Sequence, residues 1–223
     1  MLKPFLNLIF PKICLGCQVE GTYLCADCQA ILEVSDFHKK ERFGALDDLY
    51  FPVLYQHPLI KKLIWAFKYE GVKELAFDLA NLILAHFQLL EKKPLFLKNP
   101  QDYLILPIPL TKERLKRRGF NQSAELAKVL AESLKIPLET EVLLKTKETF
   151  PQAILSEKER EENVKGVFAV EQKEKIFQKK ILLVDDIFTT GATMKEAAKK
   201  LKEVGAKKVI GIVVARAKVG EDK

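Results

Sequence analysis

Three features that define common protein classes are missing from this chain of 223 residues. No run of apolar residues approaches the ~20 that a membrane-spanning helix requires, so we expect no insertion into a bilayer. The Gly-x-x-x-x-Gly-Lys-Ser/Thr pattern of P-loop proteins is absent, and so is the Gly-x-Gly-x-x-Gly pattern of dinucleotide-binding turns. A phosphate bound by this protein must therefore be held by a different motif.

Histidine and tryptophan are scarce, and the excess of positive charge is moderate. His38, His57 and His86 are isolated in the sequence and match no catalytic pattern, which favours structural roles. Trp65 and the phenylalanines are predicted to lie in the core rather than to form a base-stacking surface. Lys and Arg total 37 against 30 Asp and Glu, and no helix-turn-helix or basic aromatic groove is evident. This composition indicates DNA binding that is weak and non-specific at most.

Nearly half of the chain is hydrophobic, and its length is sufficient to bury a core. We find no internal repeat and no low-complexity tract. The cysteine distribution divides the chain into a small N-terminal module, residues 1–36, and one larger domain, residues 37–223. The segment from Ser35 to Asp48 is charged and without periodicity, so it is predicted to connect the two.

All four cysteines lie in two Cys-x-x-Cys pairs, Cys14 with Cys17 and Cys25 with Cys28. Two such turns can place four thiolates tetrahedrally around Zn²⁺, and the seven-residue spacer predicts a compact pair of knuckles. Two disulfides and a thioredoxin-like redox role are the alternatives. Met1 to Phe10 is apolar without a following small-residue cleavage site, so we interpret it as a packed helix and expect a reducing, cytoplasmic location. Zinc is therefore favoured over disulfides.

One segment combines an apolar strand, two acidic residues and a hydroxyl-rich turn. Ile181 to Val184 is a continuous aliphatic run, typical of a parallel strand that is covered on both faces. Asp185 and Asp186 follow directly, and the turn Thr189-Thr190-Gly191-Ala192-Thr193 comes next. Glycine permits a tight turn, threonine hydroxyls can donate to phosphate oxygens, and the start of a helix favours an anion. The turn is predicted to bind a phosphate.

The residues after this turn complete a βαβ unit. Thr193 is predicted to be the N-cap of a helix from Met194 to Gly205, with Glu196 completing a capping box. Val209 to Ala215 is a second, largely apolar strand. Ligands of open α/β sheets bind beyond the carboxyl ends of the strands, which is where the two aspartates are expected to lie.

The chain upstream supplies further elements of an α/β fold with a mostly parallel sheet flanked by helices. The predicted segments are a strand at Leu49–Tyr55, helices at Pro58–Lys68 and Val72–Leu90, a surface connection at Glu91–Gln101, a central strand at Tyr103–Leu106 and a helix at Ala124–Leu134. A turn between this central strand and the last helix contains five cationic side chains, Lys112, Arg114, Lys116, Arg117 and Arg118. Cations at the carboxyl end of a strand suit a polyanion.

The order of apolar strand, acidic pair and threonine-containing turn resembles the motif with which type I phosphoribosyltransferases bind 5-phosphoribosyl 1-pyrophosphate (PRPP). The resemblance implies that Asp185 and Asp186 hold the ribose hydroxyls and that Thr189 to Thr193 surround the 5′-phosphate. It implies that the basic turn binds pyrophosphate. The residues assigned to the substrate in that turn are Pro109, Leu110, Thr111, Lys112 and Arg117. The catalytic candidates are Arg118 and the two aspartates.

Motifs along nearly the whole chain resemble those of the ComF family. They are the paired cysteines, Ala66-Phe67-Lys68-Tyr69 before Gly71, Pro107-Ile108-Pro109, Arg118 to Gln122, Gln152 to Leu155 with Arg160 and Asn163, and the acidic pair with its turn. The resemblance adds Lys68 and Gln152 to the substrate-binding candidates. Members of this family are phosphoribosyltransferase-like proteins, and those of the ComFC type are associated with DNA uptake in natural transformation. The sequence departs from the family at Lys145 and Lys147, where arginine is more usual, and lysine loses the bidentate fork of arginine.

The segment from Thr146 to Val167 is too charged and too weakly patterned for a core element, and we predict a mobile lid there. The resemblance implies that this lid closes over PRPP and excludes water, with Gln152, Arg160 and Asn163 as its polar contacts.

The resemblance implies Mg²⁺-assisted transfer of a phosphoribosyl group to a nitrogen acceptor, such as a nucleobase, with release of pyrophosphate. The alternative is a non-catalytic adaptor that senses PRPP or binds DNA and works with proteins of the competence machinery. The sequence does not identify the acceptor.

Overall fold

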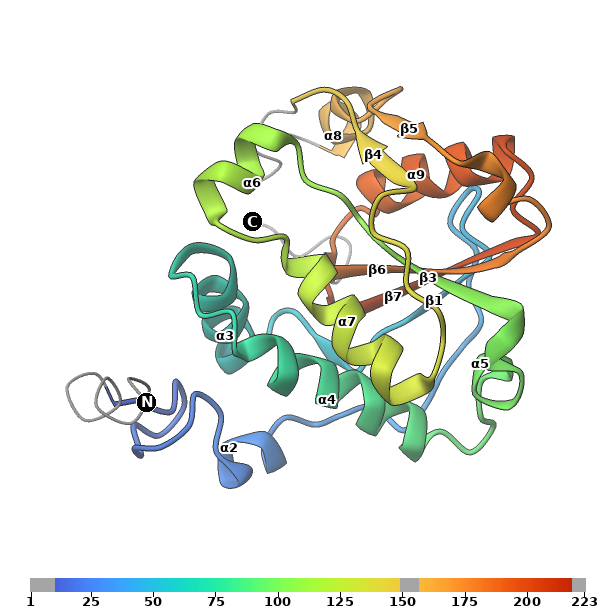
Figure 1. Cartoon of the computed structure of the whole chain (residues 1–223). Coiled ribbons are helices and arrows are strands. Elements are labelled where there is room, and N and C mark those ends of the chain that lie inside the picture. Colours follow the sequence, from blue (N-terminus) through green and yellow to red (C-terminus); the bar gives the residue numbers. More distant parts are fainter. Residues whose placement is uncertain (1–10, 149–156, 218–223) are drawn as a thin grey trace, which may run out of the picture.

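The computed structural model describes residues 11–148 and 157–217 (Figure 1). The predicted helix at Met1–Phe10 and the candidate Gln152 lie outside these residues. Across the described part of the chain, no helix is long and apolar enough to cross a membrane.

The centre of the fold is a parallel sheet of five strands. β7 (Lys208–Arg216) lies between β1 (Asp48–Tyr50) and β6 (Lys180–Phe188), and β3 (Tyr103–Pro107) pairs with the other side of β6. β2 (Val53–Leu54) also pairs with β7, beyond the end of β1. The strands are almost wholly buried, as expected for aliphatic runs that are covered on both faces. The predicted mostly parallel α/β sheet is confirmed.

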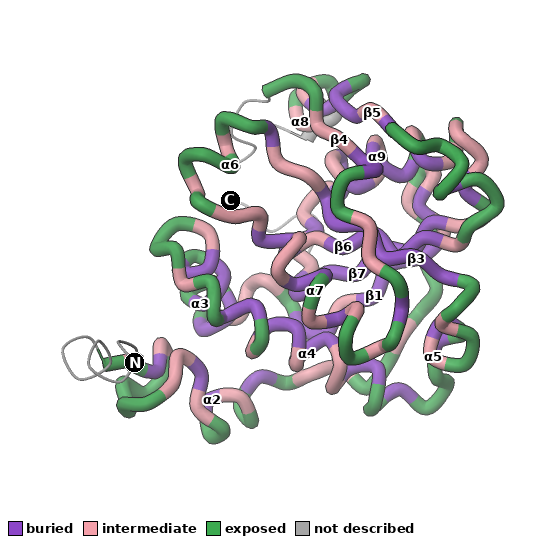
Figure 2. Tube along the Cα trace, in the orientation of Figure 1, coloured by how far each residue is buried: buried purple, intermediate pink, exposed green. Residues whose placement is uncertain are grey.

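Helices cover both faces of the sheet (Figure 1). One face carries α3 (Pro58–Tyr69), α4 (Leu75–Leu89) and α7 (Gln122–Leu134), and the other carries α9 (Ala192–Glu203). The side chains of β6 alternate between two cores: Leu182 and Val184 pack with α4 and α7, whereas Ile181 and Leu183 pack beneath α9. Full burial of each such side chain contributes about 1.5–3 kcal/mol. Figure 2 shows this buried sheet between partly exposed helices.

Strand β6 is longer than the sequence predicted, and this places the acidic pair inside the strand. Pairing with β3 ends at Val184, opposite Pro107, but pairing with β7 continues to Phe188, opposite Arg216. The aliphatic run ends at Val184, yet the ladder with β7 holds the following residues extended. Asp185 and Asp186 therefore lie on the part of β6 that runs past the end of its neighbour β3.

Three other predicted segments differ in detail. The strand predicted from Leu49 to Tyr55 is divided at Pro52, which has no N–H to donate to a ladder. The predicted surface connection after α4 contains a short helix, α5 (Leu95–Lys98), and a 3₁₀ turn at Pro100–Asp102. The predicted lid contains α8 (Glu157–Asn163). Its flanks are held by an antiparallel pair of strands, β4 (Leu143–Lys145) and β5 (Phe168–Val170).

The cysteine module packs directly on the helix α3. Its only regular helix among the described residues is α2 (Ala26–Ala30), whose N-cap is Cys25. Cys14 and Cys28 belong to the same buried cluster as Leu59 and Leu63 of α3. A Cβ atom placed on Gly16 would lie 2.4 Å from the sulfur of Cys28 and 3.4 Å from a methyl of Leu59. Only glycine allows this close approach.

Candidate functional site

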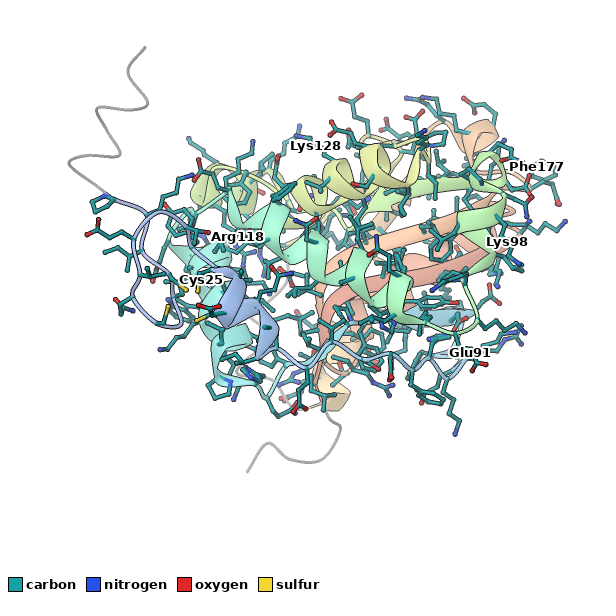
Figure 3. The ribbon with its side chains drawn as sticks, turned by 90° about the horizontal axis from the view of Figure 1, so that it is seen from below. Cys25, Glu91, Lys98, Arg118, Lys128 and Phe177 are labelled. Atoms are coloured by element: carbon teal, nitrogen blue, oxygen red, sulfur yellow. The ribbon has the colours of Figure 1, made fainter. Side chains whose placement is uncertain are left out.

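A cavity of about 660 Å³ opens at the carboxyl ends of the strands, between α3 and the start of α9. Many of the predicted site residues line it: Lys68, Pro109, Leu110, Arg117, Arg118, Asp185, Asp186, Thr189, Gly191, Ala192 and Thr193. Thr111, Lys112 and Thr190 are not part of its lining. Figure 3 shows Arg118 at the same end of the molecule as Cys25, with Glu91 and Lys98 at the opposite end.

The acidic pair is held by neighbours on two different helices. Asp186 accepts from the ammonium of Lys68, with an Nζ–Oδ1 distance of 2.7 Å, and both side chains are largely buried. The hydroxyl of Ser123, in the first turn of α7, donates to Asp185 Oδ1 at 2.8 Å, and the backbone N–H of Asp186 donates to the same oxygen at 2.9 Å. The sequence alone did not predict these contacts, because they join residues that are far apart in the chain.

Burial and charge shift the pKa values of this cluster. Burial raises the pKa of Asp185 to about 6, and the adjacent charge of Asp186 adds to this effect, against the opposing influence of Lys68 and Ser123. Burial opposes the charged form of Lys68, but the charge of Asp186 and its hydrogen bond raise the pKa of Lys68 overall. Asp185 therefore titrates closer to neutral pH than an exposed carboxyl group does, and its carboxylate form can accept hydrogen bonds from hydroxyl groups.

The turn before α9 depends on Gly191, which has φ 75°. A Cβ atom at this position would lie 2.1 Å from the ring of Phe188, so a side chain is excluded by space as well as by backbone conformation. Gly191 itself occupies the N-cap position, and α9 begins at Ala192. Glycine offers no side-chain cap, and Thr190 Oγ1 accepts from the N–H of Ala192 at 3.4 Å. The start of a helix is suited to binding an anion.

The predicted capping box at this helix is wrong. Thr193 lies inside the first turn of α9 rather than at its N-cap, because the left-handed Gly191 starts the helix two residues earlier. Glu196 accepts instead from the backbone N–H of Gly166 at 2.8 Å. Gly205, with φ 94°, follows the end of the helix as the sequence predicted.

The basic segment is a helix, α6 (Lys112–Arg118), and not the predicted turn. Thr111 caps its start by accepting from the N–H of Arg114 at 3.4 Å, and Gly119, with φ 80°, ends it. Because the segment is helical, its cations point to different sides of α6. Arg114, Arg117 and Arg118 line the cavity, at spacings that place them on one helical face. Lys112 and Lys116 are exposed and do not line it.

Two cations reach the cavity from the segment around the predicted lid, Lys145 from β4 and Arg160 from α8. Burial lowers the pKa of Lys145 to about 8, and the charge of Arg114 lowers it further, against the attraction of Asp185. Glu148 pairs with Arg114 at 3.2 Å, which connects the segment after β4 to α6. Val164 and Val167 are buried, so this end of the predicted lid is packed in the described structure.

The three histidines have structural contacts, as predicted, whereas the core prediction for the aromatic residues was partly wrong. His57 accepts from the N–H of Leu59 and caps α3, His86 contacts the carbonyl of Ser35, and His38 stacks on Tyr50. None of the three lines the cavity as described. Trp65, however, is 59% exposed, and Phe37, Phe77 and Phe177 are 69%, 61% and 61% exposed, so the predicted core positions of these four residues are wrong.

The four cysteine sulfurs lie within 4.8 Å of one another. Tetrahedral zinc with Zn–S bonds of about 2.3 Å needs sulfur–sulfur separations of about 3.8 Å, and Cys17 and Cys25 are 3.5 Å apart. Burial opposes thiolate formation at Cys14, but backbone hydrogen bonds outweigh it and lower its pKa to about 6. Burial raises the pKa of Cys28 to about 12, so a metal would be needed to keep all four groups as thiolates. The donor set fits a structural Zn²⁺.

Comparisons with known proteins show which family this chain resembles. Residues 115–223 match the model of the phosphoribosyl transferase domain family. Competence protein F of Haemophilus influenzae is 31% identical over 213 residues, covering 92% of this chain and 90% of that protein. Competence protein ComFC of Streptococcus pneumoniae is 37% identical over 114 residues, covering 51% of this chain and 48% of that protein.

Among solved structures, the glutamine PRPP amidotransferase from B. subtilis aligns with a TM-score of 0.36 and 21% identity, over 64% of this chain and 26% of that one. The relationship to competence protein F extends over almost the full length of both chains. The protein described here therefore belongs to the ComF family of phosphoribosyltransferase-like proteins.

Proposed function

We propose that the cavity binds PRPP and transfers its phosphoribosyl group to a nitrogen acceptor, releasing pyrophosphate. The observation that carries this proposal is the acidic pair, with Asp186 buried and Asp185 partly buried, which lines the same cavity as the Gly191 turn and the arginines of α6. The cations lining the cavity outnumber its carboxylates: Lys68, Arg114, Arg117, Arg118, Lys145 and Arg160 against Asp185 and Asp186. Such an excess suits a ligand with several phosphate groups.

Each part of PRPP has a matching set of groups. The carboxylates of Asp185 and Asp186 accept from the ribose hydroxyls. The turn from Thr189 to Thr193 and the N-terminus of α9 hold the 5′-phosphate. The guanidinium groups of α6 and the ammonium of Lys145 hold pyrophosphate. Arg118 remains the catalytic candidate among them, and its hydrogen bond to Gln122 holds its guanidinium in the cavity wall. Lys112, which is exposed outside the lining, has no direct role in this arrangement.

In the proposed reaction, the bond from C1′ to the pyrophosphate oxygen breaks and a bond from C1′ to the acceptor nitrogen forms. The acceptor's N–H proton goes to water, and the arginines stabilise the negative charge that develops on the departing pyrophosphate. Mg²⁺ fits this site as a partner of PRPP, because it prefers phosphate oxygens and water, with Asp185 and Asp186 as the nearest protein carboxylates, and it would neutralise phosphate charge. Lys68 fixes the orientation of Asp186 and offsets the repulsion within the acidic pair.

The experiment that tests this function is a ³¹P NMR assay of PRPP with Mg²⁺ and candidate acceptors. We expect the resonances of PRPP to be replaced by those of free pyrophosphate only when protein and a suitable acceptor are both present. Isothermal titration calorimetry should show binding of PRPP without any acceptor. A protein that neither binds PRPP nor releases pyrophosphate would contradict the assignment.

Two of the relatives are competence proteins, and this supports a second candidate, an adaptor in DNA uptake that binds PRPP without turnover. The exposed cations Lys112 and Lys116, on the outer side of α6, provide charge for weak, non-specific contact with DNA. In the same assays, the adaptor would bind PRPP in the calorimeter but release no pyrophosphate with any acceptor. These two functions are therefore distinguished by turnover and not by affinity.

The lowered pKa of Lys145 gives a prediction for the dependence of PRPP binding on pH. A lysine with a pKa of about 8 is charged at pH 7 and becomes neutral as the pH rises through 8. PRPP affinity measured by calorimetry should therefore fall about tenfold between pH 7 and 9, the loss of one charged hydrogen bond. Lys145→Arg should keep its affinity across this range, because arginine stays charged.

The matched control for this variant is Lys147→Arg, two residues further along. Lys147 is exposed and does not line the cavity, so its replacement should leave the pH profile unchanged. An equal flattening of the profile in both variants would show that Lys145 does not contact the ligand.

A further inference from the structure

The first turn of α7 carries two polar side chains that the fold buries beside the cavity. Gln122 and Ser123 are 1% and 4% exposed, and both line the cavity. Six polar or charged residues are buried in the part of the chain that the structure describes, and three of them, Gln122, Ser123 and Asp186, line this one cavity. Burying a polar group costs free energy unless it is hydrogen-bonded. The partners of these groups therefore indicate what they do.

The hydroxyl of Ser123 and a backbone N–H hold the same oxygen of Asp185. Ser123 Oγ donates to Asp185 Oδ1 at 2.8 Å, and the N–H of Asp186 donates to that oxygen at 2.9 Å. No hydrogen bond to Oδ2 of Asp185 is found within residues 11–148 and 157–217. The two donors fix the carboxylate and leave Oδ2 as the oxygen for a ligand.

Asp186 is arranged in the same way, through a different helix. Its Oδ1 accepts from Lys68 of α3 at 2.7 Å. In both carboxylates the protein thus holds one oxygen, and the second remains for a ligand. Two such oxygens on adjacent residues match a sugar with hydroxyl groups on neighbouring carbons. Ser123 does for Asp185 what Lys68 does for Asp186.

The backbone of Ser123 is fixed by the side chains of its neighbours. Asn121 accepts from the N–H of Ser123 at 3.1 Å and donates to the carbonyl of Ile108 at 3.0 Å. Gln122 donates to the carbonyl of Phe67 at 3.3 Å. The start of α7 is therefore held against α3 and against the segment that follows β3, so the hydroxyl of Ser123 has a defined position.

The hydrogen bond from Ser123 is not needed merely to satisfy Asp185. Asp185 is only partly buried and lines the cavity, so water can reach its carboxylate. What the hydroxyl adds is orientation, because the terminal torsion of an aspartate has only broad preferences. A binding group must be held close to its productive geometry by the residues behind it.

We propose that Ser123 is a positioning residue for recognition of the ribose: it holds Oδ1 of Asp185 and so turns Oδ2 toward a hydroxyl group of the sugar. This inference rests on the proposed function and adds a residue to its ribose-binding step. Ser123 acts through Asp185 and not through a phosphate group. Its loss should therefore weaken a ligand that contains the ribose and spare pyrophosphate alone.

Calorimetry with PRPP and with pyrophosphate, each in the presence of Mg²⁺, separates this role from a structural one. Ser123→Ala should bind PRPP about tenfold more weakly than the unmodified protein, the loss of one hydrogen bond to a charged group, and should bind pyrophosphate equally well. The matched control is Ser133→Ala, the same substitution at an exposed position of the same helix, which should bind both ligands normally. Equal weakening of both ligands by Ser123→Ala would show a distorted cavity and overturn the inference.

A double-mutant cycle with Asp185→Ala tests whether Ser123 acts through the aspartate. With no carboxylate to orient, Ser123→Ala should change PRPP affinity by less than about twofold in this background. A further tenfold loss would show that Ser123 acts on the ligand independently, and the inference would be wrong. Melting temperatures verify that each variant is folded.

Failure of this inference and failure of the proposed function give different results. If the unmodified protein binds PRPP and Ser123→Ala binds it as tightly, the site stands and the positioning role is wrong. If the unmodified protein does not bind PRPP, both are wrong.

Discussion

Replacing both Asp185 and Asp186 by asparagine is expected to weaken PRPP binding by about a hundredfold or more. Each carboxylate would lose a charged hydrogen bond to a ribose hydroxyl, worth roughly 1.5–3 kcal/mol. The substitution keeps the side-chain size, and the bond from Ser123 to residue 185 can persist with an amide oxygen. Calorimetry with PRPP and Mg²⁺ measures the effect.

The control for this prediction must separate loss of binding from loss of stability, because Asp186 is the partner of Lys68. Loss of Asp186 leaves a buried ammonium without its carboxylate, which by itself destabilises the fold. A triple variant that also carries Lys68→Met removes this problem and should fold but still fail to bind PRPP. Asp102→Asn, which breaks only a surface pair with Lys180, should bind PRPP normally. Undiminished affinity in the double variant would place the PRPP site elsewhere.

Removal of the Zn²⁺ that we propose for the cysteine module is expected to produce the largest loss of stability. Structural zinc contributes about 10 kcal/mol or more of apparent folding free energy to small modules. Cys14 and Cys28 share a buried cluster with Leu59 and Leu63, so loosening of the module should reach α3. Treatment with a strong chelator in reducing buffer should lower the melting temperature of the whole chain and weaken PRPP binding.

Metal analysis supplies the test of this second prediction. One zinc per chain is expected in the purified protein, and none in a Cys25→Ser, Cys28→Ser variant. Protein with no stoichiometric metal in reducing buffer, and with a melting temperature that a chelator does not change, would contradict a zinc site. A loss of stability with unaltered PRPP affinity would show instead that the module and α3 unfold separately.

Much of the sheet was predictable because its central strands are continuous aliphatic runs, a pattern that can be recognised in the sequence. The aliphatic runs of β3, β6 and β7 are buried on both faces, as is typical of the strands of a parallel sheet that helices cover on both sides. The position of the acidic pair and its turn was predictable because they follow directly after the aliphatic run of β6. Its detailed contacts with Ser123 and Lys68 were not predictable, because they join segments far apart in the chain.

The errors have local causes. Helix α6 was missed because seven mostly charged residues lack an apolar period, although its cap at Thr111 and the terminal Gly119 were visible in the sequence. Trp65 was assigned to the core because α3 is rich in apolar residues. On a helical projection, Leu63, Ile64 and Phe67 define the buried side, and Trp65 falls outside it. The position of the cavity depends on the folded structure, so the sequence could not show which aromatic residues lie near it.

The contact between Gly191 and Phe188 restricts how the phosphate turn can change during evolution or redesign. The ring of Phe188 fills the space where a side chain of residue 191 would go, and it also packs on Phe43 with centroids 4.9 Å apart. A smaller residue at 188 would make room, but it would leave a void beside Phe43 and would not remove the strain that a side chain at residue 191 would meet at φ 75°. Substitutions at positions 43, 188 and 191 should therefore be non-additive. Residue 191 can therefore carry a side chain only after compensating changes at its neighbours.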